Sequence, residues 1–397
     1  MKITEVLNKY PHLRAAAEGD NEEILHFFKS ASMNNEKFII RYDRSPDYFL
    51  HLKEQSEKFY VLLMLNQDMS IGGTATFLLR SHFHNGERVK MAYLADLRTS
   101  PTLYKRTRVE WRQFYQDLVK NFQQAEEFDG CKYLYTAILK DNHDAIRALT
   151  KKNSDLIYDE ITNYKAVSLM ARIPFIPEYK KIITANKYSI RKAVSANRER
   201  IFEFLREENL NKSFGYFFSK SEGDEFSRRE QSWQDFDIES FLIVENNNGE
   251  MVGVVYPRTF SKSKKLVCEK MSWRLKLLCK FLSLFKHCKL DIGSEIKLLY
   301  LTHLEIKLSL DDASREAIFK MMIDYLYDRK ITKDYHAILF INFSRRSLVK
   351  SLNRRRYVYK NTDVVLYQVM SREDYENHVN LMDLSKTGIL GFEIGIA

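Results

Sequence analysis

Three cations stand where a predicted strand gives way to a predicted helix. Lys105, Arg106 and Arg108 follow the strand-like segment 91–99 and open the helix-like segment that continues to Val119. A helix N-terminus already presents unpaired N–H groups and a partial positive charge, so added cations are unfavourable there unless an anion binds. The spacing suggests an anion-binding loop, and a solvated basic loop without a ligand is the alternative.

The composition limits the classes of protein to which the chain can belong. The chain has 397 residues, of which 45% are hydrophobic and 13% aromatic, so it can form packed cores, and its length predicts two domains. Lys and Arg number 63 against 53 Asp and Glu, which gives a net charge of +10. This excess suits an anionic ligand, an acidic partner or a membrane surface, without selecting among them.

The cysteines do not predict a metal site. None of the four forms a C-x-x-C pair, and no His pair at metal-ligand spacing lies near them. The segment MKITEVLNKY has no apolar h-region, and no uninterrupted apolar run reaches about 18 residues. We therefore expect no metal and a soluble, cytoplasmic protein.

The two halves of the sequence repeat one order of elements. Segment 13–28 resembles 190–205, and 93-YLADLRT-99 resembles 300-YLTHLEI-306. Each half also ends in a β-rich run, and the second half carries an insertion before its copy of the strand. These matches predict two copies of one α/β unit with a boundary near 177–186. The expected domains are 1–180 and 187–375, followed by a C-terminal tail, 376–397.

The strand 93–99 and a later segment, 141-DNHDAIRAL-149, point to a known family. Together with the element order, they resemble the GNAT acyl-CoA N-acyltransferase superfamily and, more narrowly, bacterial proteins with two GNAT-like domains in tandem. The resemblance implies an α/β (α+β) fold in which each domain is a mixed, largely antiparallel sheet flanked by helices. It also implies that the central strand splays from its neighbour and pairs with acyl-CoA through Leu97, Arg98 and Thr99.

The resemblance assigns the basic loop to the diphosphate of the cofactor. The family pattern Gln/Arg-x-x-Gly-x-Gly/Ala falls on six residues, which are Tyr104, Lys105, Arg106, Thr107, Arg108 and Val109. Thr107 and Val109 replace both glycines, whose missing Cβ allows close backbone approach to a phosphate. We expect the cations to supply by side-chain charge part of what backbone amides supply in the family.

Two further positions follow from the same comparison. Asn142 matches an asparagine of the family pattern, and we expect it to border the cofactor. In the second copy, Asp311 and Asp312 stand where the anion would bind. Like charge would repel a diphosphate there, so we expect the second copy to have a structural or substrate-shaping role.

In this family an amine attacks the thioester, a base removes a proton and an acid often protonates the departing thiolate. The usual base aligns with Tyr93. Asp96 is the only carboxylate on the strand, and strict alternation places it on the face opposite Tyr93. Asp96 is either a catalytic group or a buried, paired carboxylate. Ala148 and Leu149 stand where the usual Leu-Tyr acid pair would be, so no general acid is predicted.

Segment 262–290 reads as a basic helix inserted in the second copy. Its apolar residues recur at helical spacing and are Trp273, Leu277, Leu278, Phe281, Leu284 and Phe285. Such a helix can dock on an anionic membrane or a partner helix, but it more often packs on its own domain. We expect the packed arrangement. No nucleic-acid-binding module is recognisable, and no nucleic acid is expected.

The leading prediction is an N-acyltransferase that uses acetyl-CoA or another acyl-CoA and acts on an amine. The first alternative is a GNAT-like binding or regulatory protein that transfers nothing. The second alternative is a protein that docks on a membrane or a partner through segment 262–290.

Overall fold

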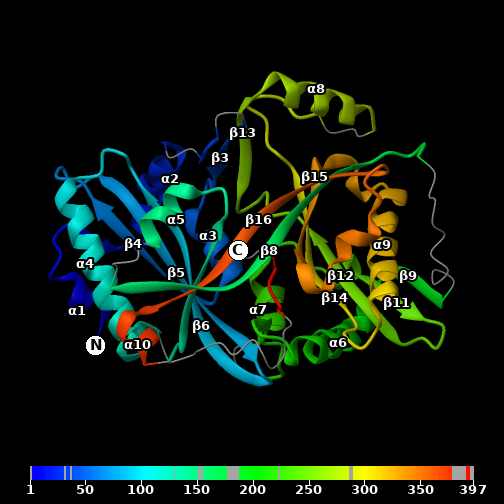
Figure 1. Cartoon of the computed structure of the whole chain (residues 1–397), viewed down its shortest axis with the longest axis horizontal. Helices are drawn as coiled ribbons and strands as arrows, with labels where there is room; N and C mark the ends of the chain where they lie inside the picture. Colours follow the sequence, from blue (N-terminus) through cyan, green and yellow to red (C-terminus); the bar gives the residue numbers. More distant parts are fainter. Residues whose placement is uncertain are drawn as a thin grey trace.

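In the computed structural model, the first half of the chain combines helices with single strands and with the consecutive strands β4, β5 and β6 (Figure 1). The structure describes residues 2–30, 33–35, 38–128, 130–150, 155–176, 187–221, 224–285, 289–377 and 390–393. The elements of the first half are α1 (Ile3–Leu7), β1 (Leu13–Ala15), α2 (Asn21–Ser30), β2 (Met33–Asn35), β3 (Phe38–Asp43), α3 (Tyr48–Gln55), β4 (Lys58–Leu65), β5 (Ile71–His84), β6 (Glu87–Thr99), α4 (Lys105–Asn121), β7 (Tyr133–Leu139), α5 (His143–Leu149) and β8 (Leu156–Arg172).

The second half repeats most of this order, with two 3-10 turns (Ser344–Arg346 and Leu348–Ser351) in place of α5 and with one insertion. Its elements are β9 (Tyr188–Lys192), α6 (Arg198–Leu210), β10 (Gly215–Tyr216), α7 (Glu225–Ser232), β11 (Leu242–Asn246), β12 (Met251–Arg258), β13 (Lys265–Met271), α8 (Trp273–Leu282), β14 (Leu298–Ile306), α9 (Asp312–Asp328), β15 (Ala337–Phe343), β16 (Tyr357–Ser371) and α10 (Arg372–Glu376). Strand β13 and helix α8 form the insertion. The predicted repeat is confirmed, whereas the predicted boundary at 177–186 lies outside the described residues.

One sheet runs through both halves (Figure 1). Its strand order is β1-β4-β5-β6-β7-β16-β8-β15-β14-β12-β11-β9, and β10 pairs with β5. The pairs β6–β7 and β14–β15 are parallel, and the other pairs are antiparallel, so the sheet is mixed and largely antiparallel as predicted. A small second sheet, β13-β3-β2, joins the insertion to the first half.

The last strand of each half pairs with strands of the other half. Strand β16 lies between β7 and β8, and β8 also pairs with β15. Each half therefore completes its sheet with a strand from the other half. Buried apolar clusters lie on both faces of the sheet in each half, so the shared strands stand inside a continuous core.

Both halves have a forked pair of parallel strands at their centre. In the first half, β6 and β7 are in register only from Met91 to Tyr93. In the second half, β14 and β15 are in register only from Leu298 to Tyr300. Three residues beyond each pairing, Asp96 and His303 adopt positive φ angles of 52° and 49°. At each bulge two residues face one residue of the preceding antiparallel strand, which kinks the central strand away from its parallel neighbour.

The predicted basic helix 262–290 is wrong in extent. Residues Lys265–Met271 form β13, which pairs with β3, and only Trp273–Leu282 form helix α8. β-Branched Val267 and the backbone hydrogen bond from Cys268 N–H to Ser294 C=O favour the extended form here. Figure 1 shows α8 projecting from the body beside β13.

Four residues of the predicted C-terminal tail lie between the two halves. Phe392 packs against Tyr93 and Tyr135 with ring centroids 6.4 Å apart in both cases. The Glu393 carboxylate accepts a hydrogen bond from the backbone N–H of His303 at 2.6 Å. This segment therefore joins the central strand of one half to the central strand of the other.

Candidate active site

The fork between β6 and β7 leaves one edge of β6 without a strand partner among the described residues. Beyond Tyr93 the register of the two strands ends, and the hydroxyl of Thr136 donates to the carbonyl of Leu94 at 2.9 Å, which bridges the root of the fork. Leu97 on β6 and Leu139 on β7 are 45% and 39% exposed. The fork is thus bordered by exposed apolar side chains and by the free edge of a strand, an arrangement that accepts an extended ligand by strand addition.

The N-terminus of α4 lies at the open end of the fork. No side chain caps this helix at Tyr104. In the described part of the chain, the N–H groups of Lys105, Arg106 and Thr107 have no hydrogen-bond partner. Such N–H groups, together with the helix dipole, bind anions.

The two residues that replace the family glycines point in different directions. The hydroxyl of Thr107 donates to the carbonyl of Leu65 at 2.6 Å, and the Thr107 side chain is fully buried. Val109 is 53% exposed. The Cβ of Thr107 therefore lies inside the fold and does not cover the helix N-terminus. Val109, in contrast, places apolar atoms at the surface of α4.

The three cations of the loop are used differently. Lys105 is exposed and has no ion-pair partner in the described part of the chain. Arg106 pairs with Glu110 at 2.9 Å but remains 63% exposed. Arg108 donates to the carbonyls of Ser100, Pro101 and Leu103, so its side chain holds the loop rather than pointing to a ligand. The predicted charge is present, and Arg108 contributes mainly to the shape of the loop.

Asn142 lies beyond the end of β7, on the other side of the fork. Its side-chain oxygen accepts the N–H of Ala145 at 3.2 Å and caps α5. The side chain is exposed, and its amide nitrogen makes no hydrogen bond within the described residues. Asn142 can therefore cap the helix and still donate to a ligand.

The corresponding fork in the second half is closed by the protein itself. Asp311 caps α9 through the N–H of Ser314, and Glu208 accepts the N–H of Leu308 in the preceding loop at 2.7 Å. Ile306, at the end of β14, is only 3% exposed. Carboxylates thus occupy the positions that an anionic ligand would need.

No family model and no curated protein sequence matches the chain. Among solved structures, Saccharomyces cerevisiae N-myristoyltransferase with bound myristoyl-CoA superimposes with a TM-score of 0.55 at 9% identity, over 90% of this chain and 82% of that one. A GCN5-related glucosamine N-acetyltransferase region of a fungal multi-domain β-N-acetylglucosaminidase superimposes with a TM-score of 0.58 at 10% identity, over 90% of this chain and 38% of that one. The chain has a tandem GNAT-like fold.

In this GNAT-like fold, the bulge of β6 changes the face on which Asp96 lies. Asp96 pairs with Arg44, whose guanidinium lies 5.0 Å from the ring centre of Tyr48. Tyr48 and Tyr93 belong to the same buried cluster. The prediction that Asp96 and Tyr93 lie on opposite faces is therefore wrong, because the extra residue at the bulge shifts the alternation of side chains.

Asp96 is held as a carboxylate. Burial raises its pKa, but the charges of Arg44 and Arg98 outweigh burial, so the pKa lies below its ordinary value. A paired carboxylate of low pKa is a weak base. Asp96 is therefore better suited to orient a cationic or hydrogen-bonding group than to accept a proton.

Cations and aromatic rings alternate beside Asp96. The guanidinium of Arg98 lies 4.5 Å from the ring centre of Phe28 and 4.9 Å from that of Tyr42. The ammonium of Lys264, which comes from the second half, lies 5.4 Å from the same Tyr42 ring. Burial and the neighbouring charge of Arg44 lower the pKa of Lys264 to about 8. No signal in the sequence points to Lys264, because the pairing of β13 with β3 joins segments that are far apart in the chain.

Tyr93 lies at the root of the fork and is 5% exposed. Its ring packs against Tyr135 and Phe392, and the guanidinium of Arg80 lies 5.3 Å from its centre. Burial raises the pKa of the Tyr93 phenol above its ordinary value, so the phenolate needed for a base is disfavoured. Tyr93 closes the inner end of the fork.

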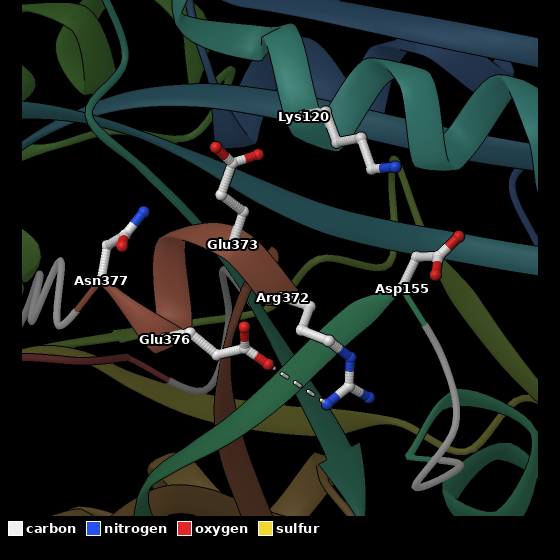
Figure 2. A pocket seen from close by; sticks show the side chains of 6 residues that line it. All are labelled: Lys120, Asp155, Arg372, Glu373, Glu376 and Asn377. Carbon is white, nitrogen blue, oxygen red and sulfur yellow. Dashed lines mark ion pairs between the residues drawn. The ribbon is translucent and has the colours of Figure 1, made fainter.

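A surface pocket of about 290 Å³ lies at the opposite end of α4. Figure 2 shows its lining residues, which are Lys120, Asp155, Arg372, Glu373, Glu376 and Asn377. Fifteen residues of helix separate Lys120 from Lys105, a rise of roughly 22 Å. The pocket is therefore not part of the fork.

Among the described residues, no cluster of three or more His, Cys, Asp or Glu side chains could hold a metal ion.

Proposed function

We propose that the chain is an acyl-CoA-dependent N-acyltransferase whose first half binds the thioester, with acetyl-CoA as the donor. One observation carries the proposal: the free edge of β6 leads directly to the uncapped N-terminus of α4, whereas the equivalent position in the second half is filled by carboxylates. The shared fold with an N-myristoyltransferase and a GCN5-related N-acetyltransferase supports the class of reaction.

In the proposed complex, the pantetheine arm pairs with the backbone of Leu97, Arg98 and Thr99 on the open edge of β6. The diphosphate binds the N–H groups at the start of α4, and the side chains of Lys105 and Arg106 add positive charge beside it. Asn142 donates from the other side of the fork. Tyr104 and Val109 border the diphosphate without a charge of their own.

The reaction would take place at the bulge of β6. The amine nitrogen attacks the thioester carbon, a C–N bond forms, the C–S bond breaks, and the amine proton is finally carried by the released thiol of CoA. We assign Asp96 to the orientation of the acceptor amine, through a hydrogen bond to its carboxylate. Tyr93 supports the strand behind the bulge and excludes water from the inner end of the fork.

The charges around Asp96 suggest the class of acceptor. Arg44, Arg98 and Lys264 surround the single carboxylate of Asp96. On β3 of the second sheet, Arg41 pairs with Asp43 and with Glu269 of β13, so the four cations named here face three carboxylates. The remaining positive charge favours an amine that also carries a carboxylate or a phosphate.

Isothermal titration calorimetry with acetyl-CoA and longer acyl-CoA thioesters tests the cofactor site. We expect the double variant K105E/R106E to bind about tenfold more weakly or worse, and this loss to shrink at high salt. The variant K350E/K360E changes two exposed lysines of the second half and is the matched control. Absence of binding by the unchanged protein contradicts the proposal.

A turnover assay separates the enzyme from a binding protein. The released thiol is measured with a panel of amines, each compared with its analogue that carries a carboxylate or phosphate. Binding of acyl-CoA without turnover on any amine would favour the regulatory alternative. Faster turnover of the anionic amines, lost in the variant R98Q, supports the assignment of the acceptor region.

A further inference from the structure

Helix α8 exposes its apolar side chains. Trp273 is 66% exposed, Leu277 is 58% exposed and Phe281 is 47% exposed. These residues follow one another at intervals of four and share a helix face. Leu284, in the turn after the helix, is 74% exposed. The expectation that this face packs on the protein is therefore wrong for these residues. The side chain of Phe285, which belongs to the same predicted stripe, is not among the described ones.

Other long helices of the chain do not share this property. Phe114 and Leu118 on α4 are fully buried, and so are Ile318 and Met322 on α9. On the opposite side of helix α8, Leu282 is 7% exposed. Its outward side thus presents Trp273, Leu277 and Leu284 as an exposed apolar surface.

The positive charge of this segment indicates which kind of surface would cover the apolar face of α8. Residues 270–290 include six Lys or Arg and no Asp or Glu. Arg274, Lys276 and Lys280 on α8 are exposed and form no ion pair with described residues. Lys280 lies at the edge of the apolar face beside Trp273, where its long stem can cover apolar surface while the ammonium reaches polar headgroups.

We infer that α8 is a peripheral docking helix for an anionic lipid surface. Basic residues at the edges of an apolar face with Trp, Phe and Leu are the composition of helices that lie in the membrane interface. No helix among the described residues is long and apolar enough to cross a membrane, so this contact lies in the plane of the surface.

The size of the face argues against a second copy of the chain as its occupant. Together with Leu278, which is 37% exposed, the four side chains named above present on the order of 500 Å². A stable protein interface needs about 800 Å² from each partner. The six cations would also face six cations across a twofold interface. Anionic headgroups remove this repulsion.

The position of α8 connects this surface to the proposed acceptor region. Lys264 immediately precedes β13, and β13 pairs with β3, which carries Tyr42. Docking through α8 would therefore hold that region near the lipid surface. This connection rests on the proposed function, but the docking of α8 does not.

Vesicle flotation of the full chain tests the inference. We expect binding to phosphatidylcholine vesicles in which about a third of the lipid is phosphatidylglycerol, weak binding to pure phosphatidylcholine, and loss of binding at high salt. The double variant W273S/L277S should bind the anionic vesicles about tenfold more weakly. The variant K276E/K280E should remove the preference for anionic lipid.

The matched control is V194S/Y375S, which changes two residues that are 52% and 47% exposed elsewhere. It should bind vesicles as the unchanged protein does, and circular dichroism should show that all variants are folded. Equal binding by W273S/L277S and the unchanged protein overturns the inference, as does no binding by the unchanged protein. Light scattering that reveals a dimer lost in W273S/L277S, without vesicle binding, assigns the face to self-association instead. Acyl-CoA titration of the same variants reports on the proposed function separately.

Discussion

Arg44 and Asp96 form a buried ion pair that ties the loop before α3 to the bulge of the central strand. The Arg44 Nη1 and Asp96 Oδ2 atoms are 2.8 Å apart, and the two side chains are 4% and 12% exposed. The pair fixes Asp96 at the one position of β6 where the backbone has a positive φ. The ion pair therefore stabilises the kink of β6 and fixes the position of the Asp96 charge beside the fork.

Loss of Arg44 should destabilise the protein strongly. R44A leaves the Asp96 carboxylate buried and unpaired, and we expect a loss of about 3–5 kcal/mol in the free energy of unfolding by urea. The double variant R44A/D96N should recover part of this loss. For comparison, R14A breaks the more exposed pair of Arg14 with Asp20 and should cost less than about 1 kcal/mol.

The same pair predicts the direction of a pH effect. The pKa of Asp96 is lowered in the folded protein, so its contribution to stability is present above about pH 4, the unfolded-state pKa. It is lost as the pH falls through the lower folded-state pKa. D96N should flatten this acid limb in urea titrations at successive pH values. An unchanged acid limb would contradict the assignment.

Lys264 should destabilise the folded protein at neutral pH. Its pKa is lowered to about 8, whereas an unfolded lysine titrates near about 10.4. Between these values the unfolded chain binds more protons, so stability should rise with pH in this window. K264M should be more stable than the unchanged protein by about 1 kcal/mol at neutral pH and lack the rise. K350M, at an exposed lysine, is the control.

The two positions that replace the family glycines should behave differently. T107V removes the buried hydrogen bond to Leu65 and should cost about 1 kcal/mol in urea unfolding without changing the affinity for acyl-CoA. V109D places a carboxylate at the exposed start of α4 and should leave stability unchanged or slightly raised. Its affinity for acyl-CoA should fall about tenfold. The reverse pattern in calorimetry would contradict the orientation of these side chains.

Glu54 on α3 links the first half to the second. Its carboxylate accepts hydrogen bonds from Arg258 on β12 and from Ser263, and both charged side chains are nearly fully buried. E54A should lower the free energy of unfolding by about 3–5 kcal/mol. The double variant E54M/R258M replaces both charges by apolar groups and should lose less than E54A. A larger loss in the double variant would show that the pair itself is strongly stabilising.

Local signals in the sequence predict several elements of the fold, although segment 262–290 contains a strand and a shorter helix where one helix is expected. Asn85-Gly86 and Asn248-Gly249 predict two hairpins, and Asn85, Gly86 and Gly249 have the positive φ angles that such turns require. The similarity of 93–99 to 300–306 predicts two copies of one unit, and each segment lies in the central strand of its half. These features depend on neighbours within a few residues, so the sequence reveals them directly.

The tertiary structure alone decided which residues meet at the fork. Whether a strand contains a bulge depends on the strand beside it, so alternation placed Asp96 on the wrong face. Strands β8 and β16 each pair with the other half, and Lys264 approaches Tyr42 from a distant part of the chain. Helix α8 remains exposed because no distant segment covers its described apolar residues fully. An apolar stripe shows that a helix has a face to bury, but only the surrounding chain determines whether anything covers it.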